Sequence, residues 1–241
     1  GKQMTQINLE ELEVTFTDWV PENSIIKVIG VGSGACNAVD YMYNHRIQGC
    51  TFIVCNTDSQ SLKKSHVPIK IQLGSGLGAG CNPTEGRNAA LSSQQDIEEK
   101  VLNTKTDMLV ITAGMGGGTG TGAAPRIASI SKELGILTVG VVTKPFNFEG
   151  KLKQKKAAQG ISNLLKNVDS LIVIPNDRLK YATEEKITLV NAFEMADNVL
   201  KQGVESVSEL INVPSFINLD FADVRSVMKD AGYAHMGVGR A

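Results

Sequence analysis

At the centre of this sequence stands the stretch Gly114-Met115-Gly116-Gly117-Gly118-Thr119-Gly120-Thr121-Gly122. An apolar run precedes it at 108–112, and a helical pattern follows it at 123–134. A strand, a glycine-rich loop and a helix in this order present bare backbone N–H groups and a helix N-terminus to an anion. The loop contains no lysine, so it is not the GxxxxGK[ST] phosphate loop. We interpret it as a cradle for phosphate groups; the alternative is a flexible glycine turn.

The composition is that of an ordinary soluble protein. With 241 residues, 42% hydrophobic and 20% charged, the chain is long enough for one large α/β domain, alone or with an appendage. The net charge of −1 gives no electrostatic reason to expect nucleic acid or an anionic membrane as a partner. Four cysteines without CxxC spacing and three histidines argue against a zinc site. No signal peptide or spanning apolar stretch is present, so we expect a cytoplasmic protein, or a piece of one that begins at Gly1.

Segments of strand and helix character alternate along the chain. Strands are expected at 24–29, 51–55, 69–73, 108–112, 136–143 and 170–174. Helices are expected at 38–43, 59–64, about 83–102, 123–134, 151–166 and 187–210, and 233–239 resembles the start of a strand with no partner after it. This alternation predicts an α/β fold, a three-layer, Rossmann-like, mostly parallel sheet with helices on both faces.

Several loops are expected to meet at one edge of that sheet. In parallel sheets, ligands bind beyond the carboxyl ends of the strands. The glycine-rich loops at 30–37, 74–83 and 114–122, the loop at 145–150 and Asn176 all fall at those ends. The first of them fits GxGxxA, a weak dinucleotide fingerprint, and Asp58 follows the second strand where a ribose-binding acid would stand. A Rossmann oxidoreductase that uses NAD is therefore an alternative to a site for several phosphates.

The motifs together are similar to those of the FtsZ/tubulin GTPase superfamily. Its GGGTGTG signature matches 116–122, and further support comes from 30–39, 56–58, 145–150, 175–177 and 218–224. The resemblance covers about 24–240. It implies an N-terminal extension at 1–23, a GTP-binding domain at 24–186, a central helix at 187–213, and a catalytic loop with the start of a truncated C-terminal domain at 214–241.

The resemblance implies a nucleotide site for GTP or GDP with Mg²⁺, without a directly predicted metal ligand. Phe193 and Asp197 lie four residues apart on the central helix, the spacing with which the family stacks on guanine and accepts its N–H groups. The alternatives are core packing for Phe193 and a solvated helix face for Asp197. The implied nucleotide-binding residues are Gly32, Ser33, Gly34, Asn37, Ala79, Gly80, Gly116, Gly117, Gly118, Thr119, Gly120, Thr121, Gly122, Pro145, Glu149, Lys153, Asn176, Phe193 and Asp197.

Asn218, Asp220 and Asp223 match the catalytic loop of the family. Carboxylates can orient a water for attack on a γ-phosphate. In FtsZ-like proteins this loop reaches the nucleotide of the neighbouring subunit, so the resemblance implies self-association into head-to-tail filaments and assembly-dependent hydrolysis. It also implies division-site localisation, other division proteins as partners and only indirect membrane contact. The alternative for Asp220 and Asp223 is helix capping. As an isolated piece, the chain would be a nucleotide-binding module with little turnover.

Three departures from the family pattern bear on the site. Ser33 and Ala35 stand where relatives usually have glycine. Lys153 replaces a common arginine, so a point charge takes the place of a bidentate fork. The loop at 74–80 is about four residues shorter than in relatives, which affects the loop expected near the γ-phosphate.

Overall fold

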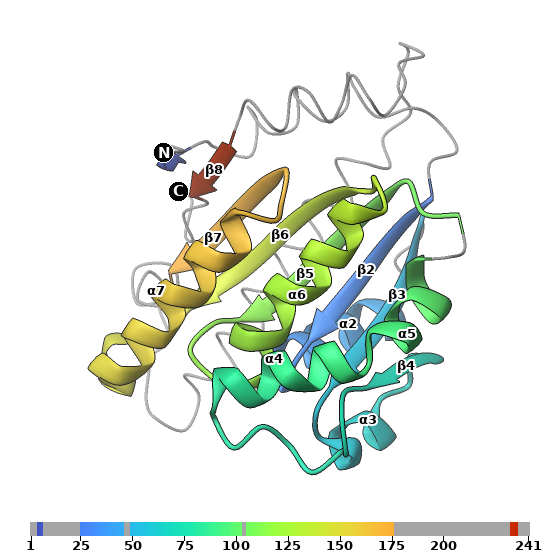
Figure 1. Cartoon of the computed structure of the whole chain (residues 1–241), viewed down its shortest axis with the longest axis horizontal. Helices are drawn as coiled ribbons and strands as arrows, with labels where there is room; N and C mark the ends of the chain where they lie inside the picture. Colours follow the sequence, from blue (N-terminus) through green and yellow to red (C-terminus); the bar gives the residue numbers. More distant parts are fainter. Residues whose placement is uncertain (1–3, 7–24, 46–48, 103–104, 176–231, 236–241) are drawn as a thin grey trace.

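The structure is a computed structural model of the chain, and it describes residues 4–6, 25–45, 49–102, 105–175 and 232–235. Within these residues, eight parallel strands form one sheet in the order β1-β8-β7-β6-β5-β2-β3-β4 (Figure 1). The strands are β1 Met4–Gln6, β2 Ile26–Val31, β3 Cys50–Asn56, β4 Ile69–Gln72, β5 Met108–Gly114, β6 Leu137–Lys144, β7 Ser170–Pro175 and β8 Gly232–His235.

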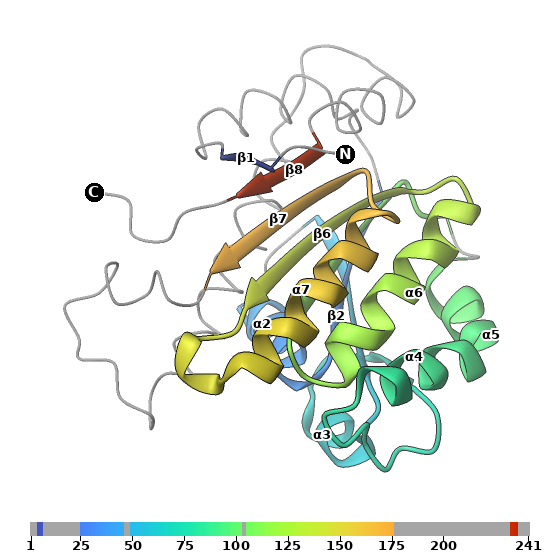
Figure 2. The same ribbon diagram turned by 60° about the vertical axis from the view of Figure 1, so that its left-hand side comes forward.

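Helices cover both faces of the sheet. On one face, α6 Thr119–Glu133 and α7 Lys151–Leu165 lie side by side, and α4 Pro83–Ser92 packs against α6 (Figure 2). α2 Ser33–Asn44 covers β2 and β3 on the opposite face. The shorter helical segments are α3 Ser59–Lys64, α5 Gln94–Ile97, a π-helical turn at Glu98–Leu102 and a 3-10 turn at Asn147–Glu149. The predicted three-layer α/β fold is confirmed.

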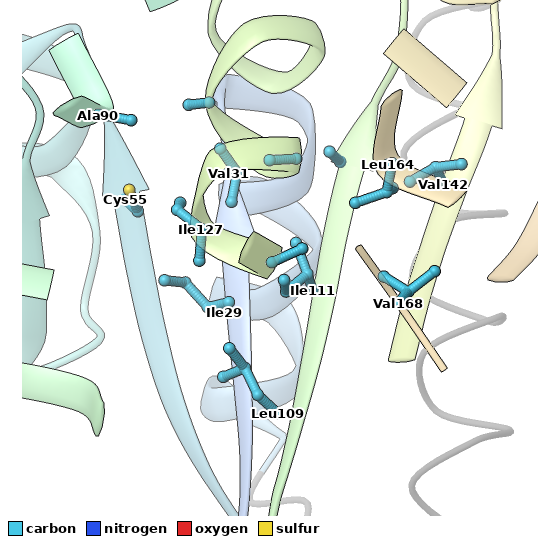
Figure 3. Close-up of a cluster of buried hydrophobic side chains, with 14 of the residues drawn as sticks. Ile29, Val31, Cys55, Ala90, Leu109, Ile111, Ile127, Val142, Leu164 and Val168 are labelled. Atoms are coloured by element: carbon cyan, nitrogen blue, oxygen red, sulfur yellow. The ribbon is translucent and has the colours of Figure 1, made fainter. Parts of the chain in front are cut away.

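The main core lies between the sheet and the α4, α6 and α7 layer (Figure 3). Ile29 and Ile111, from neighbouring strands, and Ile127, from α6, are fully buried within it. The central strands are apolar on both faces, because helices cover them on both sides. Burial of this apolar surface is the main favourable term that holds the strands in register, and it thereby fixes the ends of the strands relative to one another.

Three helices differ from the sequence expectation, and the first of them, expected at 38–43, is α2, which begins five residues earlier at Ser33. The helix expected at 123–134 begins four residues earlier, at Thr119, because Gly118 already accepts the first helical hydrogen bond from Gly122 N at 3.1 Å. The helix expected at 83–102 ends at Ser92. The chain stays helical beyond Ser93, as α5 and the π-helical turn, and the Ser93 hydroxyl accepts a hydrogen bond from Gly74 N at 3.0 Å.

The two ends of the described chain meet at the far edge of the sheet. β8 pairs with β7 and also with β1, so the strand expected near 233–239 does have partners, and it extends the main sheet. Both partners, β7 and β1, precede this strand in the chain, and the open edge of β7 offers the backbone groups with which β8 pairs. The predicted central helix at 187–213, the predicted catalytic loop and most of the predicted extension at 1–23 lie outside the described residues.

Candidate functional site

The loops after β2 and β5 leave the sheet side by side. Val31 pairs with Ala113 in the sheet, so the first and third glycine-rich loops start at the same edge. Gly32 has φ 90°, and a Cβ on it would lie 3.5 Å from Gly120 N. The N-termini of α2 and α6 are therefore adjacent, as the sequence predicts.

Backbone N–H groups are available at this junction. Within the described part of the chain, the N–H groups of Ser33, Gly34, Gly117 and Gly118 have no hydrogen-bond acceptor. Each α-helix start also carries about half a positive charge from its aligned peptide dipoles. Neither α2 nor α6 has an acidic residue in its first turn. The junction thus has the electrostatics of an anion site.

The glycines of the central loop serve two different purposes. A Cβ on Gly118 would lie 2.8 Å from Asn82 N, one on Gly120 would lie 2.7 Å from Gly114 O, and one on Gly122 would lie 1.9 Å from Pro83 O. These three glycines are required for close packing. A Cβ on Gly117 would meet nothing within 4 Å, and Gly117 is partly exposed. The space next to Gly117 is therefore open.

Hydroxyl and amide side chains hold the loops in place. Thr121 Oγ1 accepts a hydrogen bond from Gly116 N at 2.8 Å, so this predicted ligand residue fixes the loop from within. Thr57 Oγ1 and Thr119 Oγ1 are 2.6 Å apart and join the loop after β3 to the start of α6. Asn56 Nδ2 donates to Ser33 Oγ at 3.1 Å.

Asn56, Thr57 and Asn82 were not among the residues assigned to the site from sequence. Asn56 and Thr57 belong to the polar triplet 56–58 at the end of a buried strand. This triplet supported the family resemblance, but the pattern did not indicate what each side chain does. Asn82 caps α4 by accepting a hydrogen bond from Thr84 N at 3.0 Å.

The loop at 74–82 closes over the central loop. Ala79 is buried, and a Cβ on Gly118 would come within 2.9 Å of the Ala79 methyl. Gly78 N donates to Thr57 O at 2.9 Å, and Lys156 Nζ donates to Cys81 O at 2.9 Å. The structure thus brings Ala79 and Gly80 to the candidate site, and it ties this loop to β3 on one side and α7 on the other.

The loop after β6 forms another wall. A Cβ on Gly116 would lie 3.3 Å from the Pro145 ring and 3.3 Å from Lys153 O, so this wall abuts the central loop. Glu149 accepts a hydrogen bond from Phe146 N at 2.7 Å and pairs with Lys153 Nζ at 3.1 Å. The two predicted nucleotide-binding side chains therefore neutralise each other in this structure. Asn37, also predicted, is exposed on the first turns of α2.

Asp58, the ribose-binding candidate of the oxidoreductase alternative, has a structural role. Its carboxylate caps α3, accepting hydrogen bonds from Ser61 Oγ at 3.0 Å and Gln60 N at 3.0 Å. These two bonds lower the pKa of Asp58, because they stabilise its charged form. Since both carboxylate oxygens are engaged, the structure gives no support to a dinucleotide site at Asp58.

Six predicted site residues lie outside the described residues, namely Asn176, Phe193, Asp197, Asn218, Asp220 and Asp223. Among the described residues there is no group of three or more histidines, cysteines or acidic residues that could hold a metal ion. None of the helices in the described ranges is long and apolar enough to cross a membrane.

Comparison with known proteins shows similarity over most of the chain. Residues 25–184 match the tubulin/FtsZ family, GTPase domain. The chain is 55% identical over 223 residues to the cell division protein FtsZ of Buchnera aphidicola subsp. Baizongia pistaciae, covering 91% of this chain and 57% of the relative. It is 51% identical over 221 residues to that of Wigglesworthia glossinidia brevipalpis, covering 90% and 57%. The chain thus spans a little over half the length of these curated relatives.

Solved structures agree with this. The structure matches an empty FtsZ dimer from M. jannaschii with a TM-score of 0.81 at 40% identity, covering 93% of this chain and 64% of that one. It also matches a GTPγS-bound protofilament of CetZ2 from Haloferax volcanii with a TM-score of 0.69 at 17% identity, covering 87% and 64%. The second likeness concerns the fold alone.

Proposed function

The chain belongs to the tubulin/FtsZ family, and on that premise we propose that it binds GTP or GDP at the carboxyl edge of its sheet. The phosphates would occupy the junction of the first, second and third glycine-rich loops. The full-length protein would hydrolyse GTP to GDP and phosphate. The proposal excludes the oxidoreductase alternative, in which Asp58 would have to be free to bind a ribose.

A single observation carries the proposal. Gly117, just before the N-terminus of α6, has an N–H with no acceptor among the described residues and an open side-chain position, whereas a Cβ on Gly118, Gly120 or Gly122 would clash with neighbouring backbone atoms. Backbone N–H groups at helix starts bind phosphate oxygens well, because the partial charges of the peptides are already oriented. No lysine side chain is needed in such a cradle.

Mg²⁺ would accompany the nucleotide. When bound, it would neutralise charge on the β- and γ-phosphates. The described residues offer no acidic cluster for it. Mg²⁺ commonly keeps several waters and binds through substrate phosphates, so a site without an acidic cluster fits an ion that arrives bound to the nucleotide. The chain's own contribution is to position the phosphates and to exclude water around them.

Hydrolysis and assembly form the second half of the proposal. Asp220 and Asp223, with Asn218, would orient the attacking water at the nucleotide of the next molecule. Self-association into head-to-tail filaments at the bacterial division site would then complete each site, and other division proteins would bind through regions beyond this chain. By itself the chain would bind nucleotide with little turnover.

Titration with a fluorescent GTP analogue tests the binding proposal. We expect saturable binding that GTP and GDP displace and that NAD does not. The variant Gly117→Ala should weaken binding by about tenfold or more, because a methyl group would fill the phosphate position, a loss of about 1.4 kcal/mol or more. The control Ser162→Ala changes an exposed residue on α7 and should bind normally. Unchanged binding in Gly117→Ala, with an unchanged melting temperature, would refute the assignment of this loop.

A further inference from the structure

We propose that a groove between α4, α6 and α7 binds an extended acidic peptide segment of another protein. The groove has a volume of about 590 Å³ and is lined by residues of all three helices. We call it the basic groove, because its lining includes Arg87 from α4, Arg126 from α6, and Lys156 and Lys166 from α7 and its C-cap.

Charge selects an acidic ligand. The basic groove is lined by these four cationic residues and by no aspartate or glutamate. The chain as a whole has a net charge of −1, so the positive groove does not follow from a generally basic protein. A concave surface with charges of one sign concentrates the field and attracts ligands of the opposite sign.

None of the four cations is neutralised by a carboxylate within the described ranges. The ion pairs found there are Lys132–Asp169 and Lys153–Glu149. Arg126 Nη2 donates to the neutral Gln94 Oε1 at 2.9 Å, and Lys156 donates to a backbone carbonyl. The Nε of Arg126 is buried and has no hydrogen-bond partner. An incoming carboxylate would therefore gain charge-assisted hydrogen bonds without displacing an existing acid.

The shape favours a linear ligand over a compact one. The lining residues recur at Lys156, Gly160 and Asn163 on α7, the spacing of one helix face, and continue to Asn167 just beyond its C-terminus. At 1.5 Å per residue this face is about 16 Å long, which accommodates about five residues of an extended peptide. Lys156 and Lys166 stand near its two ends, so the positive charges are spread along the groove.

The polar lining fits a peptide better than a nucleic acid. No aromatic residue lines the basic groove, so it has no platform on which bases could stack. Gln159, Asn163 and Asn167 instead offer side-chain amides, which can both donate to and accept from peptide groups. The acidic side chains of an extended peptide would pair with the cations of the groove, and its backbone groups would hydrogen-bond to the side-chain amides.

The floor of the groove is preformed. A Cβ on Gly160 would lie 2.6 Å from Thr121 Cγ2, so α7 and α6 touch directly at that point. α4 crosses α6 even more closely at Gly122, where a Cβ would lie 1.9 Å from Pro83 O. Because these close contacts fix the helices relative to one another, ligand binding does not have to order the groove, and the entropic cost of association is lower.

Fluorescence anisotropy with fluorescein-labelled hexaglutamate and the whole chain tests the proposal. We expect saturable binding that weakens as salt is added. Arg87→Gln and Lys166→Gln should each weaken it about three- to fivefold, and the double variant about tenfold or more, the range of partly exposed ion pairs. The matched control is Lys155→Gln, which removes an exposed lysine of the same helix outside the groove and should change binding less than twofold.

Several results would overturn the proposal. One is that the groove variants bind hexaglutamate as tightly as the unmodified chain. Another is that Lys155→Gln weakens binding as much as the groove variants do. A third is that the unmodified chain does not bind hexaglutamate at all. With the nucleotide site saturated with GDP, tighter binding of inorganic tripolyphosphate would identify the basic groove as a site for compact anions, and tighter binding of an oligothymidylate would identify a nucleic-acid surface. Circular dichroism melting of each variant shows that it is folded, and Lys166→Gln, at an exposed helix end, decides the matter if Arg87→Gln does not fold.

Discussion

Gly122→Ala tests the close crossing of α4 and α6, on which the central loop depends. The added Cβ would lie 1.9 Å from Pro83 O and 2.7 Å from Arg87 N, whereas ordinary contacts begin at 3.4 Å. The helices would have to separate by about 1.5 Å at the crossing. Both obstacles are backbone atoms, so no side chain can rotate away.

The cost can be estimated from similar overpacked sites. Overpacking costs about 1–3 kcal/mol, and a double clash with backbone belongs at the upper end, about 3 kcal/mol. For a domain of this size that corresponds to a melting temperature lower by about 6–12 °C. The matched control is Gly117→Ala, whose Cβ meets nothing within 4 Å and which should change stability by less than about 0.5 kcal/mol.

Thermal and urea unfolding of both variants, followed by circular dichroism, measure the difference. Gly122→Ala should unfold well before the unmodified chain, and Gly117→Ala should unfold with it. If the two variants melted within about 2 °C of each other, the division of the glycines into packing and ligand positions would be refuted.

Three further predictions concern buried polar groups. Asp169→Ala should lower the free energy of unfolding by about 3 kcal/mol, because this buried carboxylate pairs with Lys132 and accepts from Thr138 N; urea unfolding against exposed Asp96→Ala checks this, and equal stability of the two would contradict it. Iodoacetamide at pH 8 should label exposed Cys81 rapidly, while buried Cys36 and Cys55 should react only after denaturation, as peptide mapping would show. Burial raises the pKa of Cys36 to about 12 and that of Cys55 well above its usual value, so the folded chain holds these protons more tightly than the unfolded chain. The urea concentration at the unfolding midpoint should therefore decrease as the pH is raised from 9 to 12, and the decrease should be smaller in Cys36→Ala.

The strand positions and the glycine-rich loops were the most predictable features. The six strands from β2 to β7 appear where apolar runs predicted them, within two residues, because a strand buried on both faces needs an uninterrupted apolar run; β1 was not predicted, and β8 ends at His235 instead of residue 239. The parallel arrangement follows from the alternation with helices, and it places all the carboxyl ends at one edge. The location of the candidate site was therefore accessible before any coordinates.

Roles of individual residues were less accessible. Thr121 reads as a phosphate ligand in the sequence, yet its hydroxyl accepts from Gly116 N. Asp58 reads as a ribose ligand and instead caps α3. Local pattern cannot distinguish these roles, since the partner of a hydrogen bond is set by which groups the fold brings within reach.

The sequence by itself determined that a strand, a glycine-rich loop and a helix follow one another here, the arrangement that predicts an anion site, because that order depends only on neighbours along the chain. Only the tertiary structure decided which glycine serves the ligand. Gly118 and Gly122 are needed because Asn82 and Pro83, distant in sequence, press against them, and Gly117 is open because nothing does. Backbone contacts between distant segments leave no trace in the local pattern, and they alone separate a glycine required by packing from one that can receive a phosphate.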